Sequence, residues 1–462
     1  MPTNQMSRAG QLAPDQGGLT PPGSSAALTL TAALLGFGLI CLDASVVNVA
    51  LPAIGSSLGG GMSGLQWVVD AYTLAFAALM LSTGAFSDRA GASRAFALGT
   101  AVFTLASAAC GLAPDLPALI GARVVQGVAA AVVLPATLAL VRQAYPEPAR
   151  RARAVAAWAA GGSLAVALGP VAGGALTTAW DWRGIFFVNL PVGAAILALL
   201  VRAPRSRPRP APLDLPGQLM AVASLVSLTF AVIEGGTAGW AALAVAVLAG
   251  GAFLRVEARQ SHPVVPLGLF RNRTVATAVA AGSACSVAFF GMVFVFSLFF
   301  QQVQGHSALS AGLMFLPMTG LIAVTNVVAG KLAGRYGPRL PMLVGQPLAV
   351  AGLLLLLYVD AGTSPALVSV LLVPLALGCA LTVPPLTAAM MDAVPAERAG
   401  LAAGVLNSAR QVAGGLGIAV FGALLGHGFQ AGVRWSLVIS AALLTVTFAL
   451  SFRLAGRSAR KS

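Results

Sequence analysis

Long apolar runs separated by short polar connectors make up almost the whole chain after its first 25 residues. A helix needs about 20 apolar residues to cross a hydrocarbon layer roughly 30 Å thick, and most of the runs approach or exceed that length. Gly and Pro inside the runs are compatible with helices, since neighbouring helices supply the freed backbone hydrogen bonds. The pattern predicts an all-α polytopic membrane protein with fourteen spans. They lie near residues 27–50, 65–86, 95–113, 116–141, 154–177, 183–201, 215–234, 239–254, 274–302, 309–332, 339–360, 363–391, 400–427 and 435–452.

The basic residues alternate between connectors. Of the 27 Lys and Arg residues, 23 fall at the termini or in every second connector, whereas Arg183 and Arg434 fall in the other connectors. Because cytoplasmic connectors carry the excess of Lys and Arg, this alternation favours fourteen helices with both termini in the cytoplasm. The remaining two, Arg123 and Arg410, lie inside apolar runs, where a charge is costly and marks a functional-site candidate.

Two longer connectors divide the runs into groups of six, two and six. The first of them is rich in Pro and Arg, which favours an extended linker. The predicted parts are a disordered cytoplasmic tail (1–25), an N-terminal six-helix bundle (26–201), a cytoplasmic linker (202–214), two inserted helices (215–254), a cytoplasmic connector (255–273), a C-terminal six-helix bundle (274–452) and a basic cytoplasmic tail (453–462).

The two six-helix parts share a loop sequence. Residues 84–94 and 330–339 each follow the second run of their half and fit the pattern G-x-x-x-(D/G)-R-x-G. Many secondary transporters consist of repeated halves with the substrate site between them near the middle of the membrane. The repeat therefore predicts a transporter of this construction.

Composition excludes several other classes of protein. With 462 residues, 58% hydrophobic and only 9% charged, the chain does not resemble a soluble domain. The net charge of +14 is divided among short connectors, so we expect a lipid bilayer and no nucleic acid as partner. No G-x-x-x-x-G-K-[ST] or H-E-x-x-H sequence occurs, so we expect neither nucleotide hydrolysis nor an enzyme, and no cofactor. The cysteines lack metal or disulfide spacing, which predicts packing residues and no metal site; they are Cys41, Cys110, Cys285 and Cys379.

Seven sequence elements follow one another on the predicted helices and connectors. They are Leu42-Asp43-Ala-Ser-Val-Val-Asn48-Val-Ala-Leu-Pro52, Gln66-Trp67-Val-Val-Asp70-Ala-Tyr72, the loop 84–94, Arg123-Val-Val-Gln126-Gly127, Ala165-Val-Ala-Leu-Gly169-Pro170-Val-Ala-Gly173-Gly174, Trp182-Arg183-Gly184-Ile-Phe-Phe-Val-Asn189-Leu-Pro191-Val-Gly193, and the stretch 400–415 with Asn407, Arg410 and Gln411. Together they resemble the major facilitator superfamily, specifically the fourteen-helix drug:proton antiporters of EmrB/QacA type. The chain departs from the usual family residues at Ser45 (usually Thr), Phe86 (Leu), Ala92-Ser93 (a basic pair), Ala165 (Gly) and Gly184 (Trp).

The resemblance implies the major facilitator fold: two six-helix bundles plus two additional helices. It also implies proton-coupled antiport that exports a drug-like or amphiphilic small molecule by alternating access. We expect a monomer in the inner membrane of a bacterium, with a small-molecule substrate and protons as partners. A dedicated exporter of an endogenous metabolite or natural product is the alternative, and the sequence does not separate the two.

Three charged residues are expected at one depth in the membrane. Asp43 lies about 16 residues into the first run, or roughly 24 Å from its inner end at 1.5 Å per residue. Arg123 and Asp70 reach a similar depth from the outer ends of their runs. Burial and a nearby guanidinium act in opposite senses on a carboxylate's affinity for protons. The hypothesis is that Asp43, with Arg123 and Asp70, couples protons; the alternatives are a static ion pair and, for Asp70, an interfacial residue.

Six further polar residues are candidates for the substrate cavity. Gln126 follows Arg123 by about one turn, although an interhelical hydrogen bond would explain it equally well. The last six runs hold no carboxylate between their ends, which leaves the cavity, backbone carbonyls or an anionic group of a substrate as neighbours of Arg410. With only Asp43 and Asp70 as acids for the cavity, neutral, monovalent or amphiphilic substrates are favoured. The six candidates are Asn48, Tyr72, Gln126, Asn407, Arg410 and Gln411.

Two glycine-rich elements are candidates for the conformational change. Small residues permit close helix approach, and a proline inside a helix permits a bend, so the first element suits a hinge or seal, with pure packing as the alternative. The second resembles the superfamily's cytoplasmic latch, in which a carboxylate caps a helix. The first comprises Gly169, Pro170, Gly173 and Gly174; the second comprises Gly84, Asp88, Arg89 and Gly91.

Overall fold

The computed structural model describes residues 22–202, 206, 208, 214–260, 263, 265–395 and 398–454. Within these ranges the chain folds into helices without strands. The helices are α1 (Pro22–Leu58), α2 (Gly61–Ala90), α3 (Ala92–Gly111), α4 (Leu116–Ala144), α5 (Pro148–Ala179), α6 (Gly184–Phe187), α7 (Asn189–Val201), α8 (Leu215–Glu234), α9 (Gly236–Arg259), η1 (Leu267–Arg271), α10 (Arg273–Leu298), η2 (Phe299–Val303), α11 (Ala308–Met314), α12 (Leu316–Tyr336), α13 (Arg339–Leu356), α14 (Pro365–Asp392), α15 (Ala399–Gly426) and α16 (Phe429–Leu454).

Each predicted apolar run coincides with a helix or with two consecutive helical segments. Thirteen helices in the described part are long and apolar enough to cross a membrane, or fourteen if the two parts of α2, bent by 65°, form one span. Of the tail predicted to be disordered, residues 1–21 lie outside the described residues, while α1 already begins at Pro22. Some helix starts carry a polar cap, as at Asp115, whose carboxylate accepts from the Ala118 amide at 2.8 Å.

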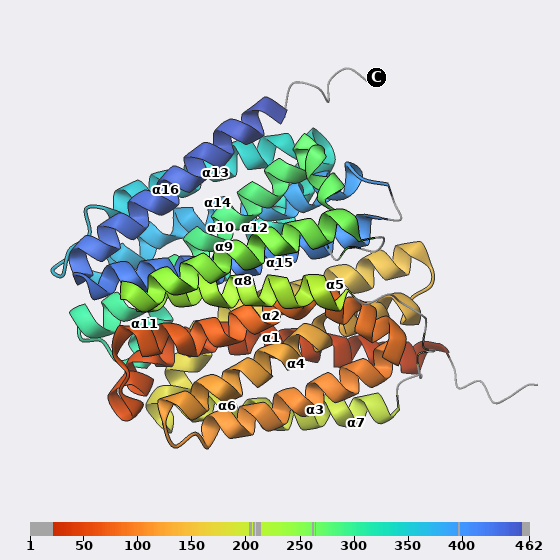
Figure 1. Ribbon diagram of the computed structural model, residues 1–462, viewed down its shortest axis with the longest axis horizontal. Coiled ribbons are helices and arrows are strands. Elements are labelled where there is room, and N and C mark those ends of the chain that lie inside the picture. The colour runs from red at the N-terminus through yellow and green to blue at the C-terminus, as the bar shows by residue number, and fades with distance from the viewer. Residues whose placement is uncertain are drawn as a thin grey trace, which may run out of the picture.

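The helices form two bundles and a separate pair (Figure 1). Helices α1–α7 form one half and α10–α16 the other, and α8 and α9 pack against each other. Helix α1 begins and α16 ends at the right of Figure 1, which we call the basic end because the Arg-rich connectors at 142–153 and 335–339 lie there. The opposite end, with the turns at 59–60 and 427–428, is the far end.

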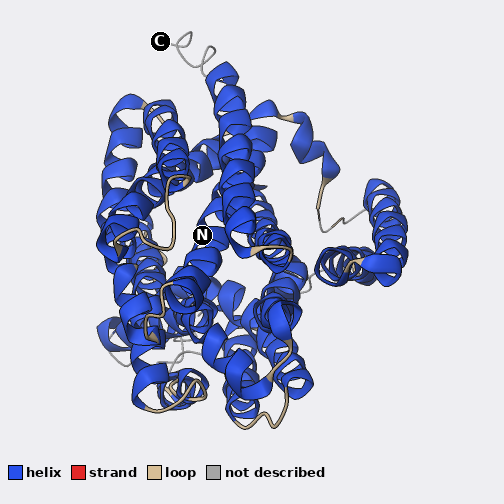
Figure 2. Cartoon of the chain, turned by 90° about the vertical axis from the view of Figure 1, so that its left-hand side faces the viewer, coloured by secondary structure: helices blue, strands red, loops and turns tan. Residues whose placement is uncertain are grey.

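The α8–α9 pair stands beside the bundles (Figure 2, right). Helix α8 contacts α2 and α15, so it lies over the line where the halves meet. Gln218 donates to the Ala78 carbonyl of α2 at 2.6 Å and accepts from Ser82. At the far end, Glu234 accepts from Trp67 Nε1 at 2.9 Å and from Ser63 Oγ at 2.8 Å. Polar contacts at both ends therefore fix α8 to the N-terminal half.

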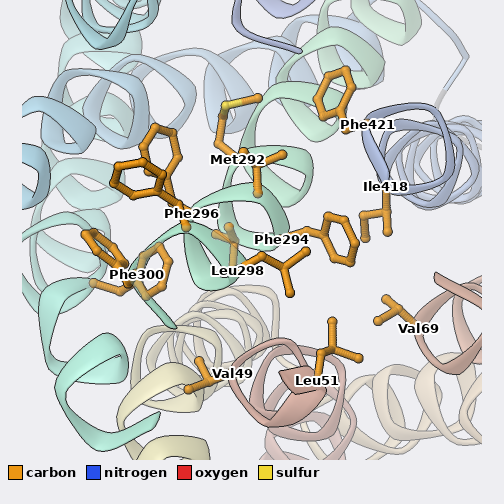
Figure 3. Close-up of a cluster of buried hydrophobic side chains, with 14 of the residues drawn as sticks. Val49, Leu51, Val69, Met292, Phe294, Phe296, Leu298, Phe300, Ile418 and Phe421 are labelled. Atoms are coloured by element: carbon orange, nitrogen blue, oxygen red, sulfur yellow. The ribbon is translucent and has the colours of Figure 1, made fainter. Parts of the chain in front are cut away.

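Helix α10 forms the apolar centre of the molecule. Its side chains lie between those of α1, α2 and α15, as Figure 3 shows for the residues around Phe294 and Leu298. Four Phe residues near its far end are fully buried: Phe294, Phe296, Phe299 and Phe300. The α-helical turns give way to a π-helical turn over 299–303, a feature that the apolar pattern did not predict. The core thus joins the two halves mainly toward the far end.

The hydrogen bonds between the two halves also lie toward the far end. Ser297 donates to the Asn48 carbonyl at 2.8 Å, and Gln301 donates to the Val49 carbonyl at 3.0 Å, which joins α10 to α1. Gln66 of α2 donates to the Ala419 carbonyl of α15 at 2.5 Å. The Leu309 amide of α11 donates to Thr178 of α5 at 3.2 Å. These hydrogen bonds hold the two halves together at the far end.

Candidate functional site

Asp43 and Arg123 form a buried ion pair between α1 and α4. The distance from Asp43 Oδ2 to Arg123 Nη1 is 2.5 Å, and both residues are 0% exposed. Arg123 Nε also donates to the Val68 carbonyl of α2 at 3.1 Å. Moving each ion out of water costs several kcal/mol, and good geometry with additional hydrogen bonds is needed to offset this cost. The stability of the ion pair therefore depends on the polar groups around it. The two residues that the sequence placed at one depth are in direct contact.

Three neutral polar side chains complete the network around the carboxylate. Gln126 accepts from Arg123 Nη1 at 2.8 Å and donates to Asp43 Oδ1 at 2.8 Å. Asn189 of α7 also donates to Asp43 Oδ1, at 2.8 Å. Ser107 of α3 accepts from Gln126 at 2.7 Å and from Asn189 at 3.2 Å. Asp43 therefore accepts three hydrogen bonds, and the predicted interhelical role of Gln126 is the one observed.

An aromatic wall encloses the arginine. The Tyr72 ring centroid lies 4.3 Å from Arg123 Cζ, and the Phe186 ring 5.8 Å from it, distances at which a cation is attracted to a ring face. Both rings are almost completely buried, and the Tyr72 hydroxyl donates to the Ile40 carbonyl at 3.3 Å. Tyr72, predicted as a cavity residue, thus lies in the wall of the ion-pair network.

Asp70 lies inside the contact between the halves. It is 0% exposed, and neither carboxylate oxygen has a hydrogen-bond partner. A Cβ added at Gly415 of α15 would lie 3.4 Å from Asp70 Oδ1, so the carboxylate faces the α15 backbone. The alternative of an interfacial residue at the mouth does not agree with this burial. A charged carboxylate without hydrogen-bond partners is costly at such a position.

A hollow lies between the halves, on the basic-end side of the contacts that close the far end. It is small, with a free volume of about 10 Å³, roughly the space of one water molecule. Asn48, a predicted cavity residue, belongs to its wall, and its Oδ1 has no hydrogen-bond partner. Apolar and aromatic side chains supply most of the remaining surface. The lining residues are Ser45, Asn48, Val166, Pro170, Phe289, Phe290, Val293 and Thr319.

The other cavity candidates lie on α15. Arg410 is half-buried against α10, and its Nε donates to Ser286 Oγ at 3.3 Å. Gln411 is half-buried and Asn407 exposed. Gln411 and Asn407 continue, toward the basic end, the face of α15 that meets α2 at Gly415, whereas Arg410 lies on the α10 side of α15. The structure thus brings Asp43, Arg123, Gln126 and Tyr72 together in one network, places Asp70 between the halves and Asn48 at the hollow, and leaves the three α15 residues apart from them.

Glycines allow α5 to approach α1. A Cβ at Gly169 would clash with Ser45 Oγ, and one at Gly173 would lie 2.5 Å from the Val46 carbonyl oxygen. Any larger residue would force the helices apart at these points. The close approach expected of small residues is therefore present on the α1 side.

A second pair of glycines joins α5 to the other half. A Cβ at Gly174 would clash with the Ala308 carbonyl oxygen, and one at Gly312 would clash with the Pro170 carbonyl oxygen. The backbones of α5 and α11 therefore touch at the far end. This contact is the position at which the predicted seal would act.

The loop at 84–94 is shorter than the sequence pattern suggested. Helix α2 includes Gly84 and continues through Asp88 and Arg89 to Ala90, and Gly91 makes the turn with φ of 85°. Asp88 and Arg89 are exposed, and neither makes a hydrogen bond or ion pair within the described residues. A Cβ at Gly91 would lie 2.7 Å from the Ser206 carbonyl oxygen, so part of the linker packs against the turn. In the described residues the Asp88 carboxylate does not cap a helix.

Sequence reasoning missed two members of the network. Asn189 appeared only as part of a family-like motif, and Ser107 carried no signal, although a buried Asn in an apolar run is a candidate for an interhelical hydrogen bond. No group of three or more His, Cys, Asp or Glu side chains in the described part of the chain could hold a metal ion. The site is thus made of one ion pair, amides and hydroxyls.

Comparison with known proteins gives concordant matches. A model of the Major Facilitator Superfamily matches residues 33–418. The multidrug resistance protein Stp of Mycobacterium tuberculosis is 41% identical over 406 residues, covering 86% of this chain and 75% of that protein. The methylenomycin A resistance protein of Streptomyces coelicolor is 37% identical over 403 residues, covering 86% and 85%. The crystal structure of a D-xylose-proton symporter covers 93% of this chain and 98% of its own, with a TM-score of 0.68 at 15% identity, which supports the fold.

Proposed function

This chain belongs to the major facilitator superfamily, and we propose that it is a proton-coupled antiporter that exports a drug-like or amphiphilic small molecule by alternating access. Relatives named for multidrug and methylenomycin A resistance support efflux as the direction of transport. The observation that carries the proposal is the buried Asp43–Arg123 pair with its three hydrogen-bonding neighbours. The pair places a titratable carboxylate beside a guanidinium and two amide donors, and these contacts depend on the charge of the carboxylate.

Asp43 is proposed as the residue that exchanges a proton. In the closed network it is ionised and accepts hydrogen bonds from Arg123, Gln126 and Asn189. Protonation would remove the attraction to Arg123 and convert an acceptor into a donor, which loosens contacts among α1, α4 and α7. The charge of the carboxylate thereby sets how tightly these helices pack.

Asp70 is proposed as a second proton-dependent element. A neutral Asp70 carboxyl can remain packed against the α15 backbone at little cost. A charged carboxylate is more stable in water, so its charge would favour separation of α2 from α15. Because the far-end seal includes this contact, the charge on Asp70 would bias the opening of that end. Asp43 and Asp70 then act on the two sides of α2.

The same geometry supports alternating access. The far end is closed by α1–α10, α2–α15 and α5–α11 contacts, with Gly169, Gly173 and Gly174 permitting the approach of α5. Gly84, Asp88, Arg89 and Gly91 lie at the other end and are proposed to contact the opposite half once that end closes. The hollow between the halves would then open to one side at a time.

The topology that fits this proposal has fourteen spans, with the basic end and both termini in the cytoplasm of a bacterial cell. The alternating Lys and Arg residues support this orientation. The chain then resembles the fourteen-helix branch, in which α8 and α9 are the additional pair. We propose that one chain is sufficient for transport, because the hollow and the ion-pair network are built from residues of a single copy.

The proton gradient suffices to drive such export. One inward proton provides about 2.3 kcal/mol per 100 mV of membrane potential, and about 1.36 kcal/mol corresponds to a factor of ten. A neutral substrate can therefore be concentrated about 50-fold per proton at 100 mV. Nucleotide hydrolysis is not needed for this gradient.

Uptake into inverted membrane vesicles tests the proposal. With an imposed inward-acidic gradient, vesicles containing the chain should accumulate methylenomycin A, ethidium or norfloxacin, and collapse of the gradient should stop accumulation. Transport that ignores the gradient, or that needs ATP, would contradict proton coupling. Ethidium and norfloxacin also separate the two substrate models, because a dedicated exporter accepts one chemical class whereas a multidrug exporter accepts several.

A further inference from the structure

Arg410 is a half-buried cation without an acidic partner. Its Nε donates to the neutral Ser286 hydroxyl at 3.3 Å, and it forms no ion pair within the described residues. The acids in the described part of the C-terminal half, Asp360 and Asp392, lie at the ends of helices or in a turn, away from the middle of α15. A guanidinium without a carboxylate beside it leaves most of its donors available.

The charges at the centre of the molecule do not balance at this position. Asp43 is occupied by Arg123 at 2.5 Å, and Asp70 faces Gly415 on the α2 side of α15. Arg410 points to the other side of α15, toward α10. The space near Arg410 therefore carries an uncompensated positive charge.

The fold makes room for this arginine. A Cβ at Gly282 of α10 would lie 3.2 Å from Arg410 Cγ and Cδ, so a glycine accommodates the aliphatic part of the side chain. Ser286, one turn further along α10, accepts a hydrogen bond from the guanidinium. Gly282 and Ser286 thus both accommodate Arg410, which indicates that its side chain has a defined position.

Arg410 lies one helical turn from the wall of the hollow. Gly414, one turn from Arg410 on α15, faces the Phe290 ring at 3.0 Å measured to an added Cβ, and Phe290, which lines the hollow, follows Ser286 by one turn of α10. Another lining residue, Asn48 of α1, has an Oδ1 without a hydrogen-bond partner. The hollow thus combines aromatic surface and one free acceptor, and a cation lies one turn away toward the basic end.

We infer that Arg410 binds an anionic group of the substrate, a carboxylate, sulfonate or phenolate carried on an aromatic or otherwise apolar body. The apolar body occupies the surface of Phe289, Phe290 and Val293, and Asn48 accepts from a hydroxyl or amide of the substrate. A guanidinium is suited to this task because it presents several donors in a fixed plane and stays charged. This inference rests on the proposed function and narrows its substrate class, which the sequence alone left at neutral, monovalent or amphiphilic compounds.

Two matched probes test the inference by binding alone. Naphthalene-2-sulfonate is an anion, and naphthalene-2-sulfonamide has nearly the same shape without the charge. Calorimetry on the full chain in phosphatidylcholine nanodiscs should show saturable binding of the sulfonate that is about 10- to 100-fold tighter than that of the sulfonamide, the range expected for a hydrogen bond to a charged group. Equal affinities, or no saturable binding of the sulfonate, would overturn it.

Variants of Arg410 assign the effect to this side chain. Arg410→Gln should lose about 10- to 100-fold in sulfonate affinity while sulfonamide binding stays within about threefold, and this retained binding shows that the variant is folded. Arg410→Lys keeps the charge but not the planar donors, so it should restore part of the preference. Ser286→Ala is the matched control, since it removes the neutral neighbour and leaves the guanidinium. An equal loss for both probes in Arg410→Gln would contradict the inference.

A comparison of two lipid compositions distinguishes binding of a substrate from binding of a lipid headgroup. Phosphatidylglycerol carries the same anionic chemistry, so nanodiscs containing it are compared with pure phosphatidylcholine. Unchanged sulfonate binding supports a substrate site; abolition of binding by phosphatidylglycerol would assign Arg410 to lipid and overturn the inference. These experiments measure binding and not transport. If gradient-driven uptake in vesicles failed, the proposal of antiport would be contradicted, but the conclusion about the binding of anions at Arg410 would not.

Discussion

Each half of the molecule contains one arginine inside an apolar run, and the two have opposite surroundings. Arg123 is fully buried and donates to a carboxylate, an amide and a backbone carbonyl, and aromatic rings cover it. Arg410 is half-buried, donates one hydrogen bond to a hydroxyl, and lies one helical turn from the wall of the hollow. A guanidinium whose donors are all occupied holds helices together, whereas one with unused donors is available to a ligand. We therefore propose that the two arginines have different tasks.

The largest expected effect follows from Arg123→Leu. Removing one partner leaves Asp43 charged, buried and unpaired, which costs about 3–5 kcal/mol. Reversible unfolding in mixed micelles should therefore show a loss of that size in the free energy of unfolding. Val124→Leu, at the neighbouring exposed position, is the control and should remain close to wild type. A loss below about 1 kcal/mol would mean that the ion pair is not essential to the N-terminal half.

A smaller loss is expected from Asn189→Leu. The substitution removes a donor to Asp43 Oδ1 and one to Ser107, and a hydrogen bond to a charged group is worth about 1.5–3 kcal/mol. The same unfolding measurement checks it. Combining it with Asp43→Leu, which removes the acceptor, forms a double-mutant cycle in which a coupling energy near zero would contradict the contact.

Arg410→Leu should change stability least. No ion pair is broken, and the cost of burying the guanidinium disappears, so the free energy of unfolding should stay within about 1 kcal/mol of wild type. Unfolding in mixed micelles is again the measurement. A loss as large as that of Arg123→Leu would show that Arg410 is structural, and the contrast between the two arginines would fail.

The sequence predicted those parts of the fold that depend on local pattern. Apolar runs of span length became helices, and the family-like motifs placed Asp43 opposite Arg123. The contacts of Asn189 and Ser107 depend on how α7 and α3 rotate about their axes, which a run of similar apolar residues does not specify. The same reason explains Asp70: its sequence position gave a depth near the mouth, but the rotation of α2 directs it to α15.

Features that arise from contacts between distant segments were also out of reach. The 65° bend in α2 and the polar contacts of Gln218 and Glu234 appear only once α8 lies against α2. The missing partner of Arg410, by contrast, was visible in the sequence, because the last six runs contain no acid between their ends. The sequence thus shows more readily that a region lacks acidic residues than how the charged residues of the molecule contact one another.

The most direct test of the central claim, that Asp43 couples protons, is transport by Asp43→Asn in inverted vesicles. The amide keeps the size of the side chain and cannot ionise. We expect that a compound accumulated by the wild-type chain still exchanges across the membrane down its own gradient, while accumulation driven by the pH gradient is lost. Accumulation by Asp43→Asn that follows the pH gradient as in the wild type would contradict it.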